Sequence, residues 1–146
     1  MASVADVYQA CLPTEAQIMK IMGLGSDLVN VRRIRHSLDH LGRPWVNKIL
    51  SPAELGRAPS WDNAEYVAKL FAAKEACSKA LGTGMTAGVQ WTCIEIELPG
   101  TARLSKGALR RMNAIAGRGQ QGLIVIDTFC KDGVAGATAI FFGAAL

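Results

Sequence analysis

Two lysines and a glutamate interrupt an otherwise apolar or small segment, FAAKEACSKALGTGM, residues 71–85. Glu75 and Lys79 are four positions apart, so on a helix they share one face, and Lys74 lies a step around it. An exposed ion pair is one interpretation, and it would contribute only about 0.3–0.5 kcal/mol. The small and apolar neighbours instead indicate partly buried charges, which need a strong partner such as a metal ion or a phosphate.

Two further candidate ligand-binding segments contain pairs of glycines. Gly82-Thr83-Gly84 follows the charged segment, and a backbone without side chains can approach a bulky ligand there, whereas a helix C-cap needs only one glycine. Asp27 follows two glycines in GLGSDLV, where an aspartate at a turn is the plain interpretation. Asp27 and Glu75 together would suit Mg²⁺, which commonly takes one or two protein carboxylates, phosphate oxygens and water.

The hydrophobic pattern predicts the elements that must position these residues. IMKIMGLGSDLV, residues 18–29, is typical of a short buried strand broken by Gly23 and Gly25. Residues 30–42 have apolar side chains at helical spacing between an asparagine cap and a glycine stop, which predicts an amphipathic helix with a basic outer face.

The rest of the chain predicts helices, one more strand and a hairpin. The residue patterns that carry these predictions are a capping box in SPAEL (51–55), a second cap in DNAE (62–65) opening a long helix to Leu81, an alternating strand in WTCIEIEL (91–98), a helix over 105–117 and a hairpin turn at 131–133. Strand, helices, strand, helix and hairpin in this order indicate an α+β fold.

Length and composition limit the classes of function. The chain has 146 residues, 50% of them hydrophobic, and a net charge of +4. The length predicts one domain, which we place at residues 18–146 after an N-terminal extension over 1–17, with a short helix in that extension as the alternative. The positive charge indicates an acidic partner or a polyanionic ligand. With 6% aromatic residues, a base-stacking nucleic-acid platform is not expected.

The sequence predicts neither membrane insertion nor secretion. No apolar stretch approaches the ~18 residues that a membrane helix needs. The first residues lack the basic start and long apolar block of a secretion signal. We therefore expect a cytoplasmic protein without a membrane span.

Three segments, GLGSDLVNVRRI, ILSPAEL and FAAKEACSKALGTGM, resemble in this order the signature of the holo-acyl-carrier-protein synthase family of 4'-phosphopantetheinyl transferases. The resemblance extends from Met22 to about Leu98 and is loose afterwards. It implies a small α+β domain with an antiparallel sheet packed against a long helix, assembled as a homotrimer. It also implies an Mg²⁺-dependent enzyme that moves the phosphopantetheine arm of coenzyme A to a serine of an apo acyl carrier protein, in fatty acid or polyketide biosynthesis.

The resemblance also implies roles for individual residues. Asp27 and Glu75 match the family's metal-binding carboxylates, and with Lys79 they form the expected catalytic set. Residues expected to bind coenzyme A are Lys74, Lys79, Gly82, Thr83 and Gly84. The serine proton has three candidate acceptors, namely Glu75, a metal-bound water and Lys79.

A basic segment matches the region with which family members dock the acidic helix of the carrier protein. Its expected docking residues are Arg32, Arg33, Arg35, Trp45 and Lys48. Without the resemblance, the plain interpretation is a solvated helix face, because charge runs on surface helices are common.

The chain departs from the family at positions that contact the phosphates of coenzyme A. The family's Ser-x-Ser-His falls on DTFC, residues 127–130, and Leu70 stands where an arginine is common. Both metal carboxylates and Lys79 are retained, so we expect an active enzyme with altered coenzyme A contacts. The alternatives are a non-catalytic carrier-protein-binding module that kept the fold, and a transferase acting on a specialised carrier domain of a polyketide or fatty-acid synthase.

Overall fold

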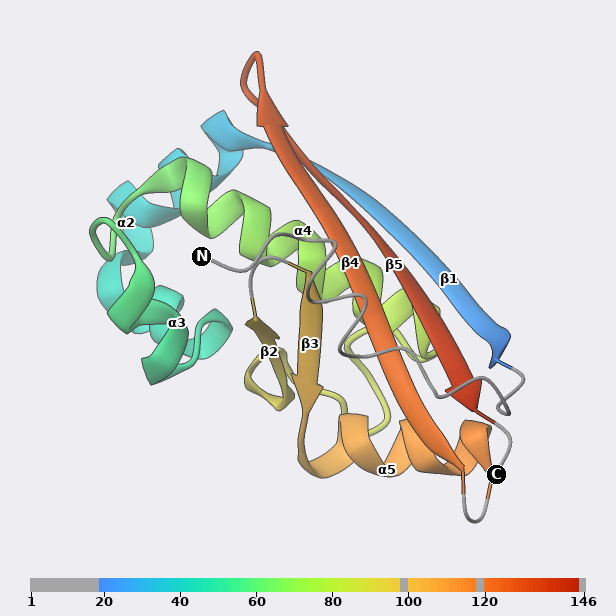
Figure 1. Cartoon of the computed structure of the whole chain (residues 1–146). Coiled ribbons are helices and arrows are strands. Elements are labelled where there is room, and N and C mark those ends of the chain that lie inside the picture. Colours follow the sequence, from blue (N-terminus) through green and yellow to red (C-terminus); the bar gives the residue numbers. More distant parts are fainter. Residues whose placement is uncertain (1–18, 98–99, 118–119, 145–146) are drawn as a thin grey trace.

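The computed structural model describes residues 19–97, 100–117 and 120–144, so the predicted N-terminal extension lies outside it. Its strands form one antiparallel sheet in the order β1-β5-β4-β3-β2, and helices lie against one face of that sheet (Figure 1). The strands are β1 (Met19–Asn30), β2 (Ile94–Glu97), β3 (Thr101–Leu104), β4 (Gln121–Lys131) and β5 (Val134–Ala144). The helices are α2 (Val31–Ile49), α3 (Pro52–Arg57), α4 (Ala64–Ala80), α5 (Lys106–Ala116) and the 3₁₀ turn η1 (Trp91–Cys93). This is the predicted α+β class.

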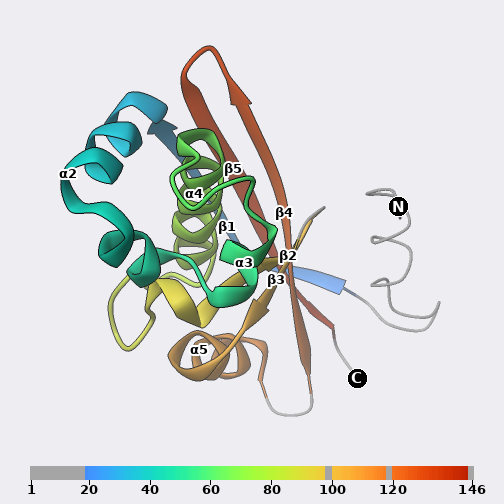
Figure 2. The same cartoon turned by 90° about the vertical axis from the view of Figure 1, so that its left-hand side faces the viewer.

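Helix α4 is the centre of the fold and packs across β1, β5 and β4 (Figure 2). It begins after Asn63, whose side chain accepts a hydrogen bond from the Tyr66 N–H, so the cap is in the predicted DNAE segment but one residue later than its capping-box pattern places it. Alanines on α4 are fully buried and let the helix lie close to the strands, among them Ala68, Ala72 and Ala76. Within the described ranges, no helix is long and apolar enough to cross a lipid bilayer.

Strand β1 differs from the short, broken strand that the sequence predicted. It is one strand of twelve residues, and its pairing with β5 is irregular only between Ile21 and Gly23. A side chain at Gly23 would collide with the Ala80 carbonyl oxygen, and one at Gly25 with that of Ala76. The glycines therefore do not break the strand, because their role is to let its backbone lie directly on α4.

Helix α2 also runs further than predicted. Asn30 caps its start and accepts the Arg32 N–H at 2.8 Å, as expected. Gly42 has a left-handed φ of 62°, but it does not end the helix as expected. The helix resumes at once and continues to Ile49, so Gly42 produces a kink. Pro44 falls in the first turn after the kink, where the missing N–H costs nothing. The kink changes the direction of the part that carries Trp45 and Lys48.

The second half of the chain confirms the predicted helix and hairpin and corrects the strand that precedes them. Residues 91–93 form η1, so β2 is shorter than the predicted strand, although Ile94 and Ile96 are buried as the alternation required. The sequence pattern did not predict β3, because Thr101–Leu104 resembles part of a turn and is only four residues long. Asp132 and Gly133 turn the β4–β5 hairpin with positive φ angles.

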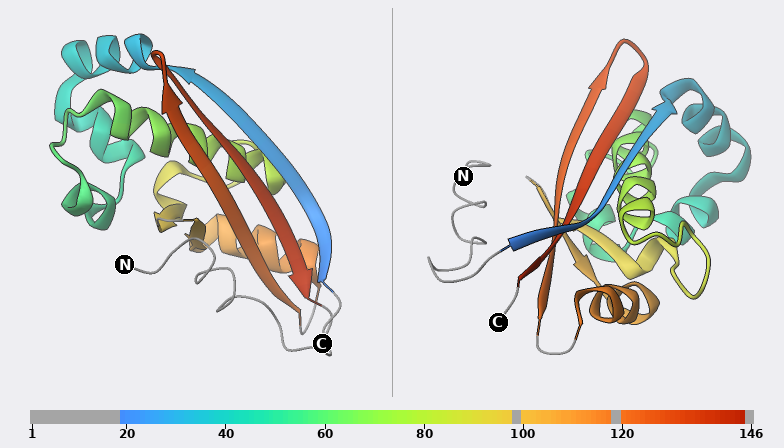
Figure 3. Two further views of the ribbon diagram at one scale, coloured as in Figure 1. Left: turned by 45° about the horizontal axis from the view of Figure 1, so that its top comes forward. Right: turned by 90° about the vertical axis from the view of Figure 1, so that its right-hand side faces the viewer.

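One face of the long strands carries exposed apolar side chains. Leu24 and Leu28 of β1 are 65% and 70% exposed, and Phe129 of β4 is 51% exposed. A side chain at Gly136 would meet both Phe129 and Leu28, so these two residues lie over the same point of the sheet. In the described part of the chain, the helices lie on the opposite face (Figure 3). This apolar sheet face, defined by Leu24, Leu28 and Phe129, has no partner within the described residues.

Candidate active site

The close approach of β1 to α4 brings Asp27 and Lys79 together. The Lys79 Nζ donates to Asp27 Oδ1 at 2.8 Å and to the Ser26 carbonyl oxygen at 2.9 Å. The Lys79 side chain is 47% exposed and that of Asp27 is 18% exposed. An ammonium has three donors, and these two bonds leave one N–H of Lys79 directed to an accessible surface. The predicted association of these residues, from positions 52 apart in the chain, is therefore present in the structure.

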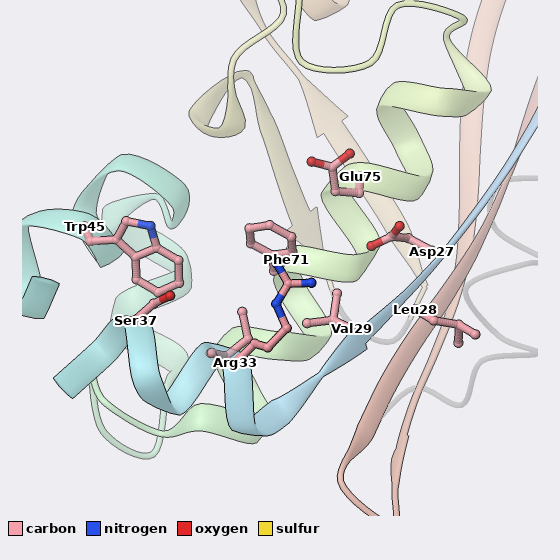
Figure 4. Close-up of a pocket in the computed structure, with 9 residues that line it drawn as sticks. Asp27, Leu28, Val29, Arg33, Ser37, Trp45, Phe71 and Glu75 are labelled. Carbon is pink, nitrogen blue, oxygen red and sulfur yellow. The ribbon is translucent and has the colours of Figure 1, made fainter. Parts of the chain in front are cut away.

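Glu75 lies beside the same pair. Burial raises the pKa of its carboxyl above the usual value, and the negative charge of Asp27 raises it further, whereas Lys79 acts in the opposite direction. The effect of Asp27 on this pKa means that the two carboxylates are close enough to repel each other. In Figure 4 both carboxyl groups lie at the same end of the pocket, Asp27 reaching in from β1 and Glu75 from α4. A cation held by both would relieve this repulsion.

The donor set of the two carboxylates fits Mg²⁺. Within the described ranges, no group of three or more histidine, cysteine or acidic side chains converges as a metal site. Mg²⁺ does not require one, because it binds through one or two carboxylates and completes its shell with water and phosphate oxygens. Lys79 occupies Oδ1 of Asp27, so an ion would share this carboxylate with the ammonium or displace it.

A pocket of about 330 Å³ adjoins the carboxylates. Figure 4 shows that its walls come from β1, α2 and α4. The lining residues are Asp27, Leu28, Val29, Arg33, Ile34, Ser37, Trp45, Phe71 and Glu75. The pocket therefore combines two acids, one guanidinium and an apolar wall, which suits a ligand with both charged and apolar parts.

The predicted docking residues fall into two groups. Arg33 and Trp45 line the pocket. Arg32, Arg35 and Lys48 are exposed on α2 outside it, and Arg35 lies 3.7 Å from the Asp39 carboxylate in a surface ion pair. Trp45 lies beyond the kink at Gly42 and lines the pocket together with residues before the kink, an arrangement that sequence spacing alone did not reveal.

The Gly82-Thr83-Gly84 loop forms the end of α4. The N–H groups of Thr83 and Gly84 both donate to the Ser78 carbonyl oxygen, at 3.2 and 3.1 Å. Gly82 and Gly84 have left-handed φ angles of 73° and 58°. The turn itself thus requires both glycines, contrary to our argument that one would suffice. The loop does not line the pocket, so its contact with coenzyme A stays a prediction.

Lys74 is not placed to bind a ligand, and this corrects the sequence-based expectation. Its side chain is fully buried, and its Nζ donates to Glu54 Oε2 at 2.7 Å. Burial lowers the pKa of Lys74 from its usual value, and the charge of Glu54 opposes that shift. The expectation failed because Lys74 and Lys79 are in one motif but on different sides of α4, and only Lys79 faces the accessible side.

Phe71 is a pocket residue that the sequence analysis did not single out. It lies four positions before Glu75 on α4, and its ring packs against Trp91 with centroids 4.5 Å apart. Helical spacing was the available signal, since residues at i and i+4 share a face. Leu70, which stands where the family commonly has an arginine, is buried in the core at 2% exposure. Residues 127–130 lie within β4, paired with β5.

Known proteins match this chain in sequence and in fold. The family model for the 4'-phosphopantetheinyl transferase superfamily matches residues 23–131. A holo-acyl-carrier-protein synthase from Sinorhizobium medicae is 43% identical over 117 residues, covering 75% of this chain and 84% of the relative. One from Xanthobacter autotrophicus is 42% identical over 106 residues, covering 69% and 78%.

Solved structures agree with the sequence relatives. The Helicobacter pylori holo-acyl-carrier-protein synthase in complex with coenzyme A superposes with a TM-score of 0.68 at 27% identity, over 81% of this chain and 98% of that one. The Plasmodium yoelii holo-acyl-carrier-protein synthase gives a TM-score of 0.72 at 25% identity, over 88% and 99%. The chain therefore belongs to the holo-acyl-carrier-protein synthase family of the 4'-phosphopantetheinyl transferase superfamily.

Proposed function

We propose that this protein transfers the 4'-phosphopantetheine arm of coenzyme A to a serine of an apo acyl carrier protein, giving the holo carrier and adenosine 3',5'-bisphosphate. The observation that carries the proposal is the meeting of Asp27, Glu75 and Lys79 beside a pocket of mixed polarity. Relatives at 43% and 42% identity are named holo-acyl-carrier-protein synthases, and one similar structure holds coenzyme A.

Asp27 and Glu75 are the proposed ligands for Mg²⁺. When bound, the ion supplies positive charge and orientation to the diphosphate, which is most of what phosphoryl transfer requires. Lys79 contributes a second positive charge from the same surface. Its ammonium already donates to Asp27 and Ser26 and has no lone pair, so it suits neutralising a phosphoryl oxygen. This leaves Glu75 or a water beside it as the acceptor of the serine proton.

The basic part of α2 is the proposed docking surface for the carrier protein. Arg33 and Trp45 would act at the pocket, where the serine must arrive, and Arg32, Arg35 and Lys48 would attract the acidic carrier from outside it. Clustered positive charge of this kind steers an acidic partner and is screened by salt.

A homotrimer is the proposed assembly. It is supported by the apolar sheet face, where Leu24, Leu28 and Phe129 are each more than half exposed. Large exposed apolar patches mark contact surfaces in soluble proteins. A closed ring of identical copies would cover this face equally in every copy.

The non-catalytic alternative, a carrier-binding module, is not favoured. Burial and the nearby charge of Asp27 raise the pKa of Glu75, which means that keeping Glu75 ionised costs folding free energy. A binding module would gain nothing from a carboxylate whose ionisation lowers the stability of the fold. A cation-dependent transferase needs both carboxylates.

Mass spectrometry of an apo carrier protein tests the proposal directly. The carrier is incubated with coenzyme A, Mg²⁺ and the protein, and its mass should increase by that of one phosphopantetheine arm. Chelating the metal should stop the reaction, and so should Asp27→Asn or Glu75→Gln, since loss of a single preorganised electrostatic group typically costs about 10²–10³-fold in kcat. A carrier of unchanged mass with the unaltered protein would contradict the proposed function.

A further inference from the structure

The pair of Lys74 and Glu54 has no part in the chemistry proposed above, although both side chains are fully buried. The Lys74 ammonium donates to Glu54 Oε2 at 2.7 Å, to the Ile49 carbonyl oxygen at 2.6 Å and to the Trp91 carbonyl oxygen at 3.0 Å. An ammonium has three N–H donors. All of them are used, each toward a different segment of the chain.

The Glu54 carboxylate is equally occupied. Its Oε1 accepts the Ile96 N–H at 2.7 Å, and its Oε2 accepts the Ser51 N–H at 2.7 Å in addition to Lys74. Among the described residues, no buried side-chain nitrogen or oxygen lacks a hydrogen-bond partner. The pair therefore connects α4 to the end of α2, to α3, to η1 and to β2.

These connections lead to the walls of the pocket. Ile49 ends the part of α2 that carries Trp45, and Trp91 packs its ring on Phe71. Trp45 and Phe71 both line the pocket. The next residue in the chain after Lys74 is Glu75. The buried ammonium of Lys74 is therefore connected, through hydrogen bonds, ring packing and the chain itself, to two apolar residues of the pocket wall and to one of its carboxylates.

Stability alone does not explain a buried ion pair, because well-packed apolar residues of similar volume are often as stable or more so. An apolar pair would, however, leave the carbonyl groups of Ile49 and Trp91 and the N–H of Ile96 without these partners. Hydrogen bonds are directional, so the charged pair fixes where each segment sits, whereas apolar contacts fix only how closely it packs.

We infer that Lys74 and Glu54 are positioning residues, which set the places of Trp45 and Phe71 relative to Glu75 without touching substrate. The inference rests on the proposed function for its kinetic consequence. The full burial of Lys74 and the use of all its donors exclude direct contact with a phosphate. Loss of the pair should displace the pocket walls and leave Asp27 and Lys79 in place.

The test compares the full-length protein with a double variant, Glu54→Met with Lys74→Met. Methionine is unbranched and of similar length, and replacing both partners avoids leaving one buried charge unpaired, which is strongly destabilising. Arg103→Met is the matched control, because it breaks the exposed ion pair between Arg103 of β3 and Glu97 of β2. Urea unfolding shows which variants are folded.

We expect the double variant to fold, to lose near-ultraviolet circular dichroism from the packed Trp91 and Phe71 rings, and to raise KM for the carrier. The rise should be roughly tenfold to a hundredfold, as small misplacements of contact groups commonly produce, while KM for coenzyme A changes much less. Arg103→Met should change neither quantity.

Two outcomes would overturn the inference. One is a folded double variant with unaltered dichroism and kinetics, which would make the pair ordinary core filling. The other is an equal rise in both KM values. If the double variant does not fold, Glu54→Gln with Lys74→Met takes its place, because neither side chain is then charged and the glutamine oxygen keeps an acceptor for a backbone N–H. Should the unaltered protein fail to modify any carrier, the proposed function fails, whereas the dichroism still decides the positioning role.

Discussion

Helix α4 carries two lysines that each bind an acidic side chain from another element, and the two pairs differ in almost every other respect. Lys74 and Glu54 are fully buried, whereas Lys79 is 47% exposed and Asp27 is 18% exposed. All donors of Lys74 are used inside the fold, whereas Lys79 keeps one for an accessible surface. One motif thus provides a structural pair and a chemical pair, and burial distinguishes them.

The largest expected difference between the pairs is in stability. Lys74→Met leaves the Glu54 carboxylate buried without its partner, and breaking such a pair typically costs about 3–5 kcal/mol. Lys79→Met breaks a partly exposed pair, which is typically worth about 0–1 kcal/mol. Urea unfolding of both variants measures this. Equal losses would contradict the division into a structural and a chemical pair.

Metal binding should depend on the two carboxylates, Asp27 and Glu75, and not on either lysine. Adding Mg²⁺ at a hundred times its dissociation constant should stabilise the unaltered protein by about 2.7 kcal/mol, because the ion binds the folded state alone. Asp27→Asn and Glu75→Gln should abolish this gain. Lys79→Met should retain it, since it frees Oδ1 of Asp27. Thermal melts with and without Mg²⁺ give the result, and an undiminished gain in Glu75→Gln would remove Glu75 from the metal site.

The chemical pair also depends on the approach of β1 to α4. Gly25→Ala places a methyl group against the Ala76 carbonyl oxygen, and overpacking of this kind typically costs about 1–3 kcal/mol. It should also separate Asp27 from Lys79 and weaken the Mg²⁺ effect. Gly56→Ala in α3 is the control, because a side chain there meets no other atom within 4 Å. Unchanged melts in Gly25→Ala would show that β1 can shift without cost.

The smallest expected effect is a pH dependence confined to the metal-free protein. The folded-state pKa of Glu75 lies above its usual value of 4.5, so the folded state binds this proton more tightly than the unfolded chain. Its contribution to stability is therefore present below pH 4.5 and lost as pH rises through the raised pKa. Glu75→Gln should remove that loss and melt higher than the unaltered protein at neutral pH. A lower melt for Glu75→Gln would reverse the sign and refute the assignment.

Several parts of the fold followed from local sequence because their causes are local. The capping box at Ser51 is present, with reciprocal hydrogen bonds between its ends. Asn30 and Asn63 cap their helices through their own side chains, and Asp132-Gly133 turns the hairpin. Each of these depends on residues a few positions apart, which is the range over which a sequence pattern can be interpreted.

Other features depended on residues far apart in the chain. The two glycines of β1 looked like strand breakers until the carbonyl groups of Ala76 and Ala80 explained them. The kink at Gly42 and the short β3 likewise needed the surrounding packing to define them.

The sequence by itself identified the family and the long helix, and it singled out Asp27 and Glu75 as candidate site residues. These features lie in compact motifs of fixed spacing. It did not determine which lysine of the motif lies on the accessible side of α4. Lys74 owes its burial to Glu54, twenty positions earlier, and to the carbonyl group of Trp91, seventeen positions later. Whether a side chain is buried depends on which elements pack over its face of the helix, and only the tertiary structure brings those elements together.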